Sequence, residues 1–268
     1  MQLVSNTPRY ISDFFGLTAL LKNWWLFYFD YFGFLKQYRI VYKLRTGVNL
    51  YAEPNQGDGI IINETWRKKV YTPLHFEIGK DDIVIDIGAH KGYFSTFASL
   101  AAKNGKVYAF EPMEDNYNIL KKNIKVNKCI NVIPFQLGIS GAKGIRKLYV
   151  SPDSSSGMSL IKEWFKDDKR KITSFYIKCI TLHDIFSLCR IKKIDFLKID
   201  CEGAEHEILL NTPIESLAKI NKISMEFHQI GRLRVGILKN LLKQNGFIVK
   251  VEDPKNTIGM LYARRENN

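Results

Sequence analysis

The chain has 268 residues, 46% of them hydrophobic and 25% charged, which is typical of a folded globular protein and argues against disorder except at the ends. This length suits one well-buried α/β domain with an additional segment. The formal net charge of +13 favours contacts with nucleic acid, anionic lipid or phosphorylated substrates, but it does not choose between these and an ordinary solvated surface. Four scattered cysteines without a Cys-x-x-Cys pair argue against a zinc site and a disulfide framework, and no metal is expected. With no evident signal peptide, the sequence predicts a cytoplasmic protein.

The stretch from Phe14 to Tyr38 is unusually rich in Trp, Tyr and Phe. It is nearly long enough to cross a bilayer, but Lys22 and Asp30 would then lie in the hydrocarbon, so a spanning helix is not expected. Two interpretations remain. The preferred one is a helical arm packed on the domain, and the other is an interfacial helix that makes a peripheral membrane contact.

Two short strands, at 40–51 and 59–63, are expected next, with a turn over 55–59 between them. We assign residues 1–75 to an N-terminal extension and residues 76–268 to the main domain. From Ile83 onward, strands and helices alternate, which predicts a mostly parallel sheet with helices on both faces.

Ile83 to Asp86 is an almost wholly apolar strand that leads into a turn bracketed by Gly88 and Gly92. The helix that follows, Tyr93 to Lys103, carries apolar residues at helical spacing and can lie back on the sheet. Such a turn lies at the carboxyl end of a strand, where open α/β sheets bind ligands.

The spacing of this turn indicates which ligand it binds. A dinucleotide-binding turn has Gly-x-Gly-x-x-Gly, whereas the spacing here is Gly-x-x-x-Gly with Asp86 at the strand end. A carboxylate repels a pyrophosphate and attracts the ammonium of a methionine moiety, so the turn favours S-adenosylmethionine over NAD. Glu111 ends the next strand, 107–110, where an acid can accept hydrogen bonds from ribose hydroxyls.

The remaining elements follow in order. A helix at 114–127 and a strand at 131–136 lead to the turn 137–140, where the adenine ring is expected. A polar loop at 151–157 and a Lys-rich insertion at 162–178 are expected to be flexible and are a candidate lid. A fourth strand, 194–199, ends in Asp200-Cys-Glu-Gly203, and the helix 204–210 places His206 at the surface. A fifth strand at 221–227, a helix at 232–244 and two antiparallel strands at 247–251 and 258–263 complete the chain.

Two motifs identify a family resemblance. They are Val84-Ile-Asp-Ile-Gly-Ala-His-Lys-Gly92 and Ile194-Asp-Phe-Leu-Lys-Ile-Asp-Cys-Glu-Gly-Ala-Glu205, with Phe110-Glu-Pro112 between them. Over roughly residues 60–264 the chain resembles the FkbM family of S-adenosylmethionine-dependent methyltransferases. The resemblance implies an α/β, Rossmann-like, seven-stranded class I methyltransferase sheet, mostly parallel with an antiparallel last strand, and O-methylation of a hydroxyl on a sugar, glycan or related metabolite. His90 and Lys91 depart from the residues common in the family and are expected to make the turn more cationic.

The predicted cofactor contacts come from the glycine turn, the strand end at Glu111 and the later turns. They are Asp86, Gly88, Ala89, His90, Gly92, Tyr93, Glu111, Pro112, Asn116, Leu137, Gly138 and Asp200.

Transfer of an activated methyl to a hydroxyl needs in-line positioning and a base for the departing proton. His228 ends a strand beside Asp200 and Glu202 and titrates near neutral pH, so it is the expected base. Asp200 is then expected to orient the acceptor, and Glu202 to bind its hydroxyls.

Three other functional classes remain as alternatives to O-methylation. A nucleic-acid methyltransferase would explain the net charge, but Asp200-Cys-Glu-Gly203 lacks the prolines typical of enzymes that methylate base amino groups, and its acids would repel phosphate. An NAD-type oxidoreductase and a non-catalytic binding module are the further alternatives. The expected partner is a small molecule or glycan, with a lipid-linked acceptor and the oligomeric state left open.

Overall fold

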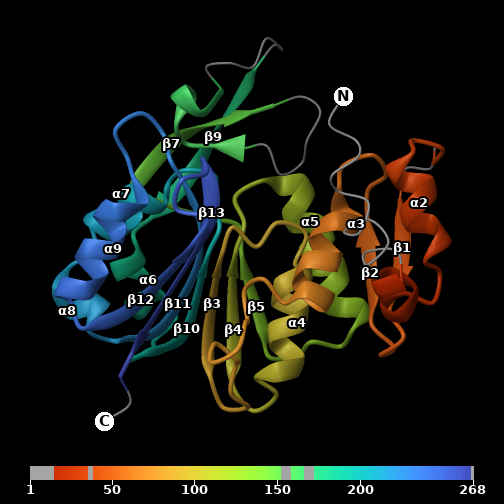
Figure 1. Cartoon of the computed structure of the whole chain (residues 1–268), viewed down its shortest axis with the longest axis horizontal. Coiled ribbons are helices and arrows are strands. Elements are labelled where there is room, and N and C mark those ends of the chain that lie inside the picture. The colour runs from red at the N-terminus through yellow and green to blue at the C-terminus, as the bar shows by residue number, and fades with distance from the viewer. Residues whose placement is uncertain (1–14, 36–38, 152–157, 166–171, 267–268) are drawn as a thin grey trace.

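The computed structural model describes residues 15–35, 39–151, 158–165 and 172–266. Its centre is a seven-stranded sheet in the order β12-β13-β11-β10-β3-β4-β5 (Figure 1). In this sheet β13 runs antiparallel to β11 and β12, and the pairs from β11 to β5 are parallel. The prediction of a mostly parallel, seven-stranded class I methyltransferase sheet is therefore confirmed. The strands are β3 (Ile83–Ile87), β4 (Lys106–Phe110), β5 (Val132–Phe135), β10 (Ile194–Ile199), β11 (Ile220–His228), β12 (Phe247–Glu252) and β13 (Ile258–Arg265).

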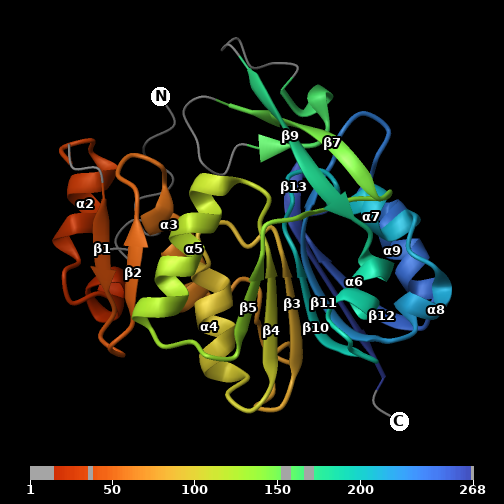
Figure 2. The ribbon, with the colours of Figure 1, turned by 180° about the vertical axis from the view of Figure 1, so that it is seen from behind.

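Helices cover both faces of this sheet (Figures 1 and 2). Alternate side chains of β3 explain why: Val84 belongs to the apolar core on one face and Ile85 to the core on the other. A strand buried on both faces favours apolar residues at successive positions, as Ile83, Val84 and Ile85 show. The helices are α4 (Tyr93–Ala101) and α5 (Glu114–Val126) on one face, and α6 (Leu182–Leu188), α7 (Glu205–Leu210), α8 (Ile214–Leu217) and α9 (Val235–Gln244) on the other.

A second, four-stranded sheet has the order β6-β9-β7-β8. Its members are β6 (Gly138–Ile139), β7 (Gly144–Val150), β8 (Met158–Ser159) and β9 (Thr173–Ile180), and a 3-10 helix, η2 (Lys162–Phe165), follows β8. The predicted flexible insertion over 162–178 is therefore wrong for 173–178, which pair with β7. The lysines before this segment suggested a solvated loop, but residues 173–178 contain one lysine and are otherwise rich in aromatic and β-branched residues, which favour a strand. Residues 152–157 and 166–171 of the predicted lid lie outside the described residues.

The N-terminal unit contains α2 (Trp25–Tyr31), the hairpin of β1 (Ile40–Lys43) and β2 (Asn49–Ala52), α3 (Asp58–Asn63) and a π-helix, η1 (Glu64–Lys68). Two predictions about it are wrong, because residues 59–63 form a helix and the hairpin turn falls between 43 and 49. The run Ile60-Ile61-Ile62 resembles a buried strand, but only Ile62 is fully buried. Gly57, with φ +75°, starts α3 and directs it onto the unit's own core.

This unit is fastened to the main domain by polar contacts. Asn123 on α5 accepts a hydrogen bond from Tyr51 N–H, and Lys91 Nζ lies 2.6 Å from Asp58 Oδ2. Lys91 is fully buried and also pairs with Glu53 at 3.0 Å, so the predicted cationic effect on the glycine turn is wrong for this residue. Among the described residues, no helix is both long and apolar enough to cross a membrane.

Candidate active site

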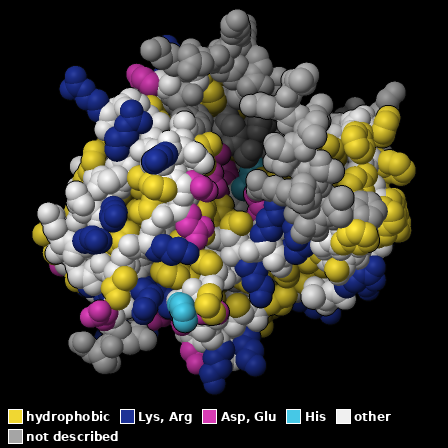
Figure 3. Space-filling model, in the orientation of Figure 1, with side chains coloured by type: hydrophobic (Ala, Val, Ile, Leu, Met, Phe, Trp, Pro, Cys, Tyr) yellow, Lys and Arg dark blue, Asp and Glu magenta, His cyan; other side chains and the backbone are white. Residues whose placement is uncertain are grey.

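A cavity of about 280 Å³ opens at the carboxyl ends of the parallel strands. Acidic side chains gather at its rim (Figure 3). The small sheet forms one wall through Leu148, Met158 and Ile177, and η1 with the end of α3 forms another. The predicted site residues that line the cavity are Gly88, Ala89, His90, Tyr93, Glu111, Pro112, Leu137, Gly138, Asp200 and Glu202. Asp86, Gly92, Asn116 and His228 are buried around it or behind its wall and do not line it.

The glycine turn brings three strand ends together. Gly88 has φ +72°, and a Cβ there would collide with the backbone oxygen of Asp200 at the end of β10. The N–H groups of Gly88 and Ala89 both donate to Phe110 O at the end of β4, at 3.1 and 3.0 Å. Gly92 has φ +79° and packs directly on Leu120. The two glycines are therefore required for close backbone approach, which leaves the cavity open beside them.

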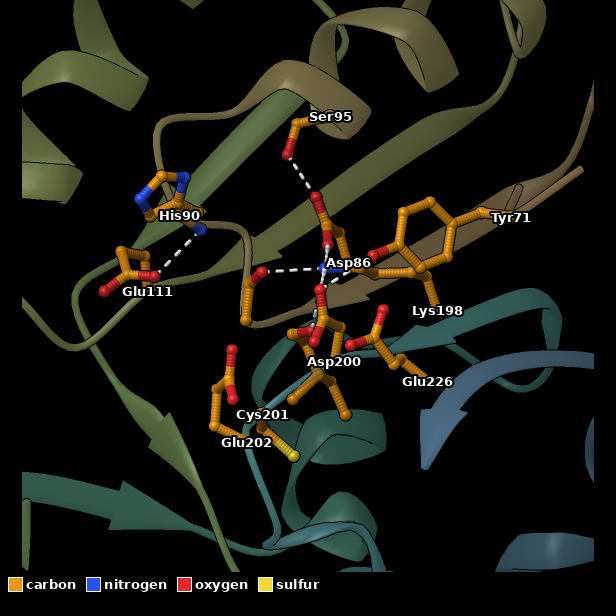
Figure 4. Close-up of polar contacts among 12 residues, drawn as sticks. Tyr71, Asp86, His90, Ser95, Glu111, Lys198, Asp200, Cys201, Glu202 and Glu226 are labelled. Carbon is orange, nitrogen blue, oxygen red and sulfur yellow. Dashed lines mark hydrogen bonds and ion pairs between the residues drawn. The ribbon is translucent and has the colours of Figure 1, made fainter. Parts of the chain in front are cut away.

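Glu111 lies beside this turn with both carboxylate oxygens in use (Figure 4). Oε2 accepts from His90 N–H at 2.8 Å, and Oε1 accepts from Met113 N–H at 2.9 Å. Burial raises the pKa of Glu111 to about 7. Each carboxylate oxygen can accept a further hydrogen bond, so this fixed side chain suits the predicted ribose hydroxyls.

Asp86 is fully buried, does not line the cavity and lies between Ser95 and Lys198 (Figure 4). Ser95 Oγ donates to its Oδ2 at 2.6 Å, and Lys198 Nζ lies 3.2 Å from its Oδ1. Lys198 lines the cavity and donates to Gly88 O at 2.7 Å. The predicted direct contact of Asp86 with the methionine ammonium is thus not the arrangement found: Asp86 holds Lys198, and Lys198 holds the turn. A lysine inside the apolar strand 194–199 was the signal that the sequence offered for this role.

The cavity also contains an acidic cluster. Asp200, Glu202 and Glu226 all line it, and Tyr71 Oη donates to Asp200 Oδ2 at 2.7 Å. Burial raises the pKa of Glu202 well above its usual range and also raises that of Glu226. Glu226 was missed from the sequence, although it lies two residues before His228 and so shares its face of β11.

His228 lies behind this cluster, fully buried. Its Nδ1 is 3.1 Å from Glu205 Oε1, and its Nε2 is 3.4 Å from Glu202 Oε2 and 3.5 Å from Glu226 Oε1. Burial alone would lower its pKa, but Glu205 and the other two carboxylates raise it to about 11. A protonated imidazole cannot accept a proton, so this geometry argues against the predicted role of His228 as general base. His206, expected at the surface, is buried against α9, because its Nε2 meets Arg234 O at 3.3 Å.

The lining fits S-adenosylmethionine. Among the residues that the structure describes, five carboxyl side chains line the cavity (Glu64, Glu111, Asp200, Glu202 and Glu226), against one lysine. An acidic cavity attracts the sulfonium and ammonium cations of this cofactor and repels a pyrophosphate, which disfavours NAD. Phe110, Pro112 and Leu137 supply an apolar surface for the adenine ring.

This fold and this cavity define a class I methyltransferase that uses S-adenosylmethionine. Residues 86–249 match the methyltransferase FkbM domain, and the chain belongs to that family. It is 24% identical over 232 residues to the 31-O-demethyl-FK506 methyltransferase FkbM of Streptomyces tacrolimicus, with 76% of this chain and 87% of the relative covered. It is 26% identical over 174 residues to the hexuronic acid methyltransferase AglP of Haloferax volcanii, with 62% and 67% covered.

Two further comparisons bear on length and fold. The chain matches the AMB antimetabolite synthetase AmbE of Pseudomonas aeruginosa at 24% identity, covering 71% of this chain but spanning only 11% of that protein. The crystal structure of methyltransferase FkbM from Methylobacillus flagellatus superimposes with a TM-score of 0.51 at 14% identity, covering 95% of this chain and 59% of that one. This second likeness concerns the fold alone.

Proposed function

We propose that this protein transfers a methyl group from S-adenosylmethionine to a hydroxyl of a sugar, glycan or related metabolite. The observation that carries the proposal is the acidic cluster of Asp200, Glu202 and Glu226 in the same cavity as the cofactor turn. Carboxylates bind sugar hydroxyls by accepting hydrogen bonds from them. Two relatives whose names describe methylation of a hexuronic acid and of a demethylated oxygen, AglP and FkbM, are compatible with this acceptor class.

The cofactor supplies an electrophilic methyl on a sulfonium, so the protein must position the acceptor and take its proton. We propose Glu226 as the group that accepts this proton. It lines the cavity, and a raised pKa makes its carboxylate a stronger base than an ordinary glutamate. The acceptor oxygen bonds to the methyl carbon, the S–CH₃ electron pair returns to sulfur, and the hydroxyl proton moves to Glu226.

The other members of the cluster have different roles in this proposal. Asp200 is oriented by Tyr71 and lies 3.7 Å from Lys198, so its charge is partly balanced and it suits acceptor binding. The imidazolium of His228 lies 3.5 Å from Glu226 Oε1 and favours its ionised form, although burial still raises the pKa of this half-buried side chain. His228 is then a positioning residue.

A nucleic-acid substrate is disfavoured by the same cavity, because the five carboxyl groups of its described lining would face a phosphate backbone. The test is transfer of a deuterated methyl from S-adenosylmethionine to glycan and RNA fractions of one cell extract, followed by mass spectrometry. Label is expected in glycan or small-metabolite hydroxyls, and label confined to RNA would refute the proposal.

The base is tested separately with Glu226→Gln. We expect turnover to fall by about 10²- to 10⁴-fold, the usual effect of losing a general base, while calorimetry shows unchanged cofactor affinity. Glu252→Gln, on β12, which β13 separates from β11 in the sheet, lies outside the cavity lining and is the matched control. A Glu226→Gln enzyme with near-normal turnover and pH profile would exclude Glu226 as the base.

A further inference from the structure

The helix α2 is apolar on its exposed side as well as on the side packed against the core of the N-terminal unit. Its single charged residue, Asp30, is only 6% exposed, whereas Phe29, Tyr31 and the following Phe32 face solvent. Asp30 is held inside because its Oδ2 accepts from Tyr42 Oη at 2.9 Å and its Oδ1 accepts from Asn55 N–H at 2.6 Å. A surface helix normally buries its apolar side and exposes its charges. The fold therefore leaves an apolar face outside that core packing does not explain.

The exposed aromatic side chains form one continuous surface. We name Trp25, Phe29, Tyr31, Phe32 and Phe34 the aromatic patch; their exposed fractions range from 47% at Trp25 to 69% at Phe34. The ring of Phe32 lies 5.4 Å from that of Tyr31 and 6.3 Å from that of Phe34, and Phe29 lies 6.5 Å from Phe34. Clustered exposed apolar side chains of this size mark an interaction site rather than ordinary surface.

The exposed charges of the segment that carries the aromatic patch have one sign. Within the described residues of 15–63, the exposed charged side chains are all basic: Lys22, Arg39, Lys43 and Arg45. The acids of the same segment are withdrawn, since Asp30 and Asp58 are buried and Glu53 pairs with Lys91. This surface thus combines interfacial aromatic residues with cations and complements an anionic partner.

The shape of the surface favours one kind of anionic partner. α2 lies at the outer end of the molecule, beyond the hairpin and far from β12 (Figures 1 and 2), and hydrophobic side chains cover that end (Figure 3). Proteins bind single-stranded nucleic acid in grooves, where the bases stack on aromatic rings. The end of the molecule at α2 projects instead, and a projecting end can insert into the planar surface of a bilayer. Trp, Tyr and Phe with flanking Lys and Arg are the residues that settle at the boundary of a bilayer.

We propose that the aromatic patch is a docking surface for an anionic lipid bilayer, on which the enzyme binds peripherally. Docking depends on two contributions: insertion of the aromatic side chains between the headgroups, and attraction of the flanking cations to negative lipids. The second contribution weakens as salt rises, because the Debye length falls. This proposal does not depend on the identity of the methyl acceptor.

The experiment is cosedimentation of the full chain with vesicles of phosphatidylcholine alone or with about a third phosphatidylglycerol. The triple variant Phe29→Ser, Phe32→Ser, Phe34→Ser removes exposed rings and should retain the fold. We expect the wild type to bind the anionic vesicles and the triple variant to bind at least tenfold more weakly. The matched control replaces Ile130, Ile145 and Ile214, which are at least as exposed but lie in the main domain, with Ser and should bind like the wild type.

Salt and alternative partners complete the test. Binding should weaken on raising salt from 50 to 300 mM, and Lys22→Gln with Lys43→Gln should lower it further at low salt. Calorimetry with S-adenosylmethionine should give the same affinity for all variants, which shows that each is folded. Equal vesicle binding by the wild type and the triple variant would overturn the proposal. So would absence of vesicle binding together with patch-dependent binding to single-stranded RNA, or a patch-dependent dimer in analytical ultracentrifugation.

Discussion

The contact between His228 and Glu205 makes a pH-dependent prediction about stability. Both side chains are fully buried and their charged atoms are 3.1 Å apart. In the folded protein the pKa of His228 is raised from 6.5 to about 11, so the pair stabilises the fold fully below about pH 6.5. Between pH 6.5 and pH 11 the folded chain keeps the proton on His228 whereas the unfolded chain has released it. Folding then requires uptake of a proton, so the stabilisation is progressively lost as the pH rises.

The size of the effect follows from linkage. Each unit of pKa difference corresponds to about 1.4 kcal/mol, so the contribution of His228 should fall by about 3 kcal/mol between pH 6 and pH 9. The total cost of removing one partner should be about 3–5 kcal/mol at pH 6, the usual range for a broken buried ion pair. Because Glu205 has a lowered pKa, its own contribution is present above about pH 4.5 and is lost in acid.

The measurement is urea unfolding of the wild type and His228→Gln at pH 6 and pH 9. The difference in unfolding free energy between the two proteins should shrink by at most about 3 kcal/mol over this interval, because the contribution of His228 is lost while Glu202 and Glu226, which interact with it, also titrate differently in the variant. A second variant, Glu205→Gln, should remove most of the same pH dependence. A difference that stays constant from pH 6 to pH 9 would show that His228 is neutral in the folded protein, and would restore it as a candidate base.

Two further predictions concern the glycine turn and the attachment of the N-terminal unit. Gly88→Ala should abolish measurable cofactor binding in calorimetry, because its Cβ collides with Asp200 O. Gly57 has nearly the same φ and open space around it, so Gly57→Ala should lower the unfolding free energy only by the roughly 1–2 kcal/mol of a left-handed alanine. Equal behaviour of the two variants would contradict the close approach. Lys91→Met should lower the unfolding free energy by about 3–5 kcal/mol, because it leaves Asp58 buried without this cation. The control, Lys250→Met, breaks an exposed pair with Glu252 and should lower the unfolding free energy by under about 1 kcal/mol. A loss at Lys91 as small as that at Lys250 would show that the buried pair does not hold the unit.

The sequence by itself determined the main sheet and the class of ligand. The almost wholly apolar run from Ile83 indicates a strand covered on both faces, and Gly88 and Gly92 mark the turn that follows. These signals are local, because burial and backbone conformation constrain neighbouring residues directly. The acid at the end of the next strand, Glu111, could be placed for the same reason, since strand ends in a parallel sheet meet at one edge.

The tertiary structure alone decided which polar groups meet. Asp86 and His228 stand at strand ends as expected, yet each is turned to a partner distant in sequence: Asp86 to Lys198, and His228 to Glu205. Whether a histidine is a base or a fixed cation depends on the carboxylates packed around it, and these come from β11 and from the segment around α7. The same holds for Asp30, which is buried by its hydrogen bond with Tyr42 while its neighbours Phe29 and Tyr31 in α2 are exposed. Contacts between residues distant in sequence determine whether His228 is charged and which residues of α2 are exposed. The pattern of residues within one segment does not predict such contacts.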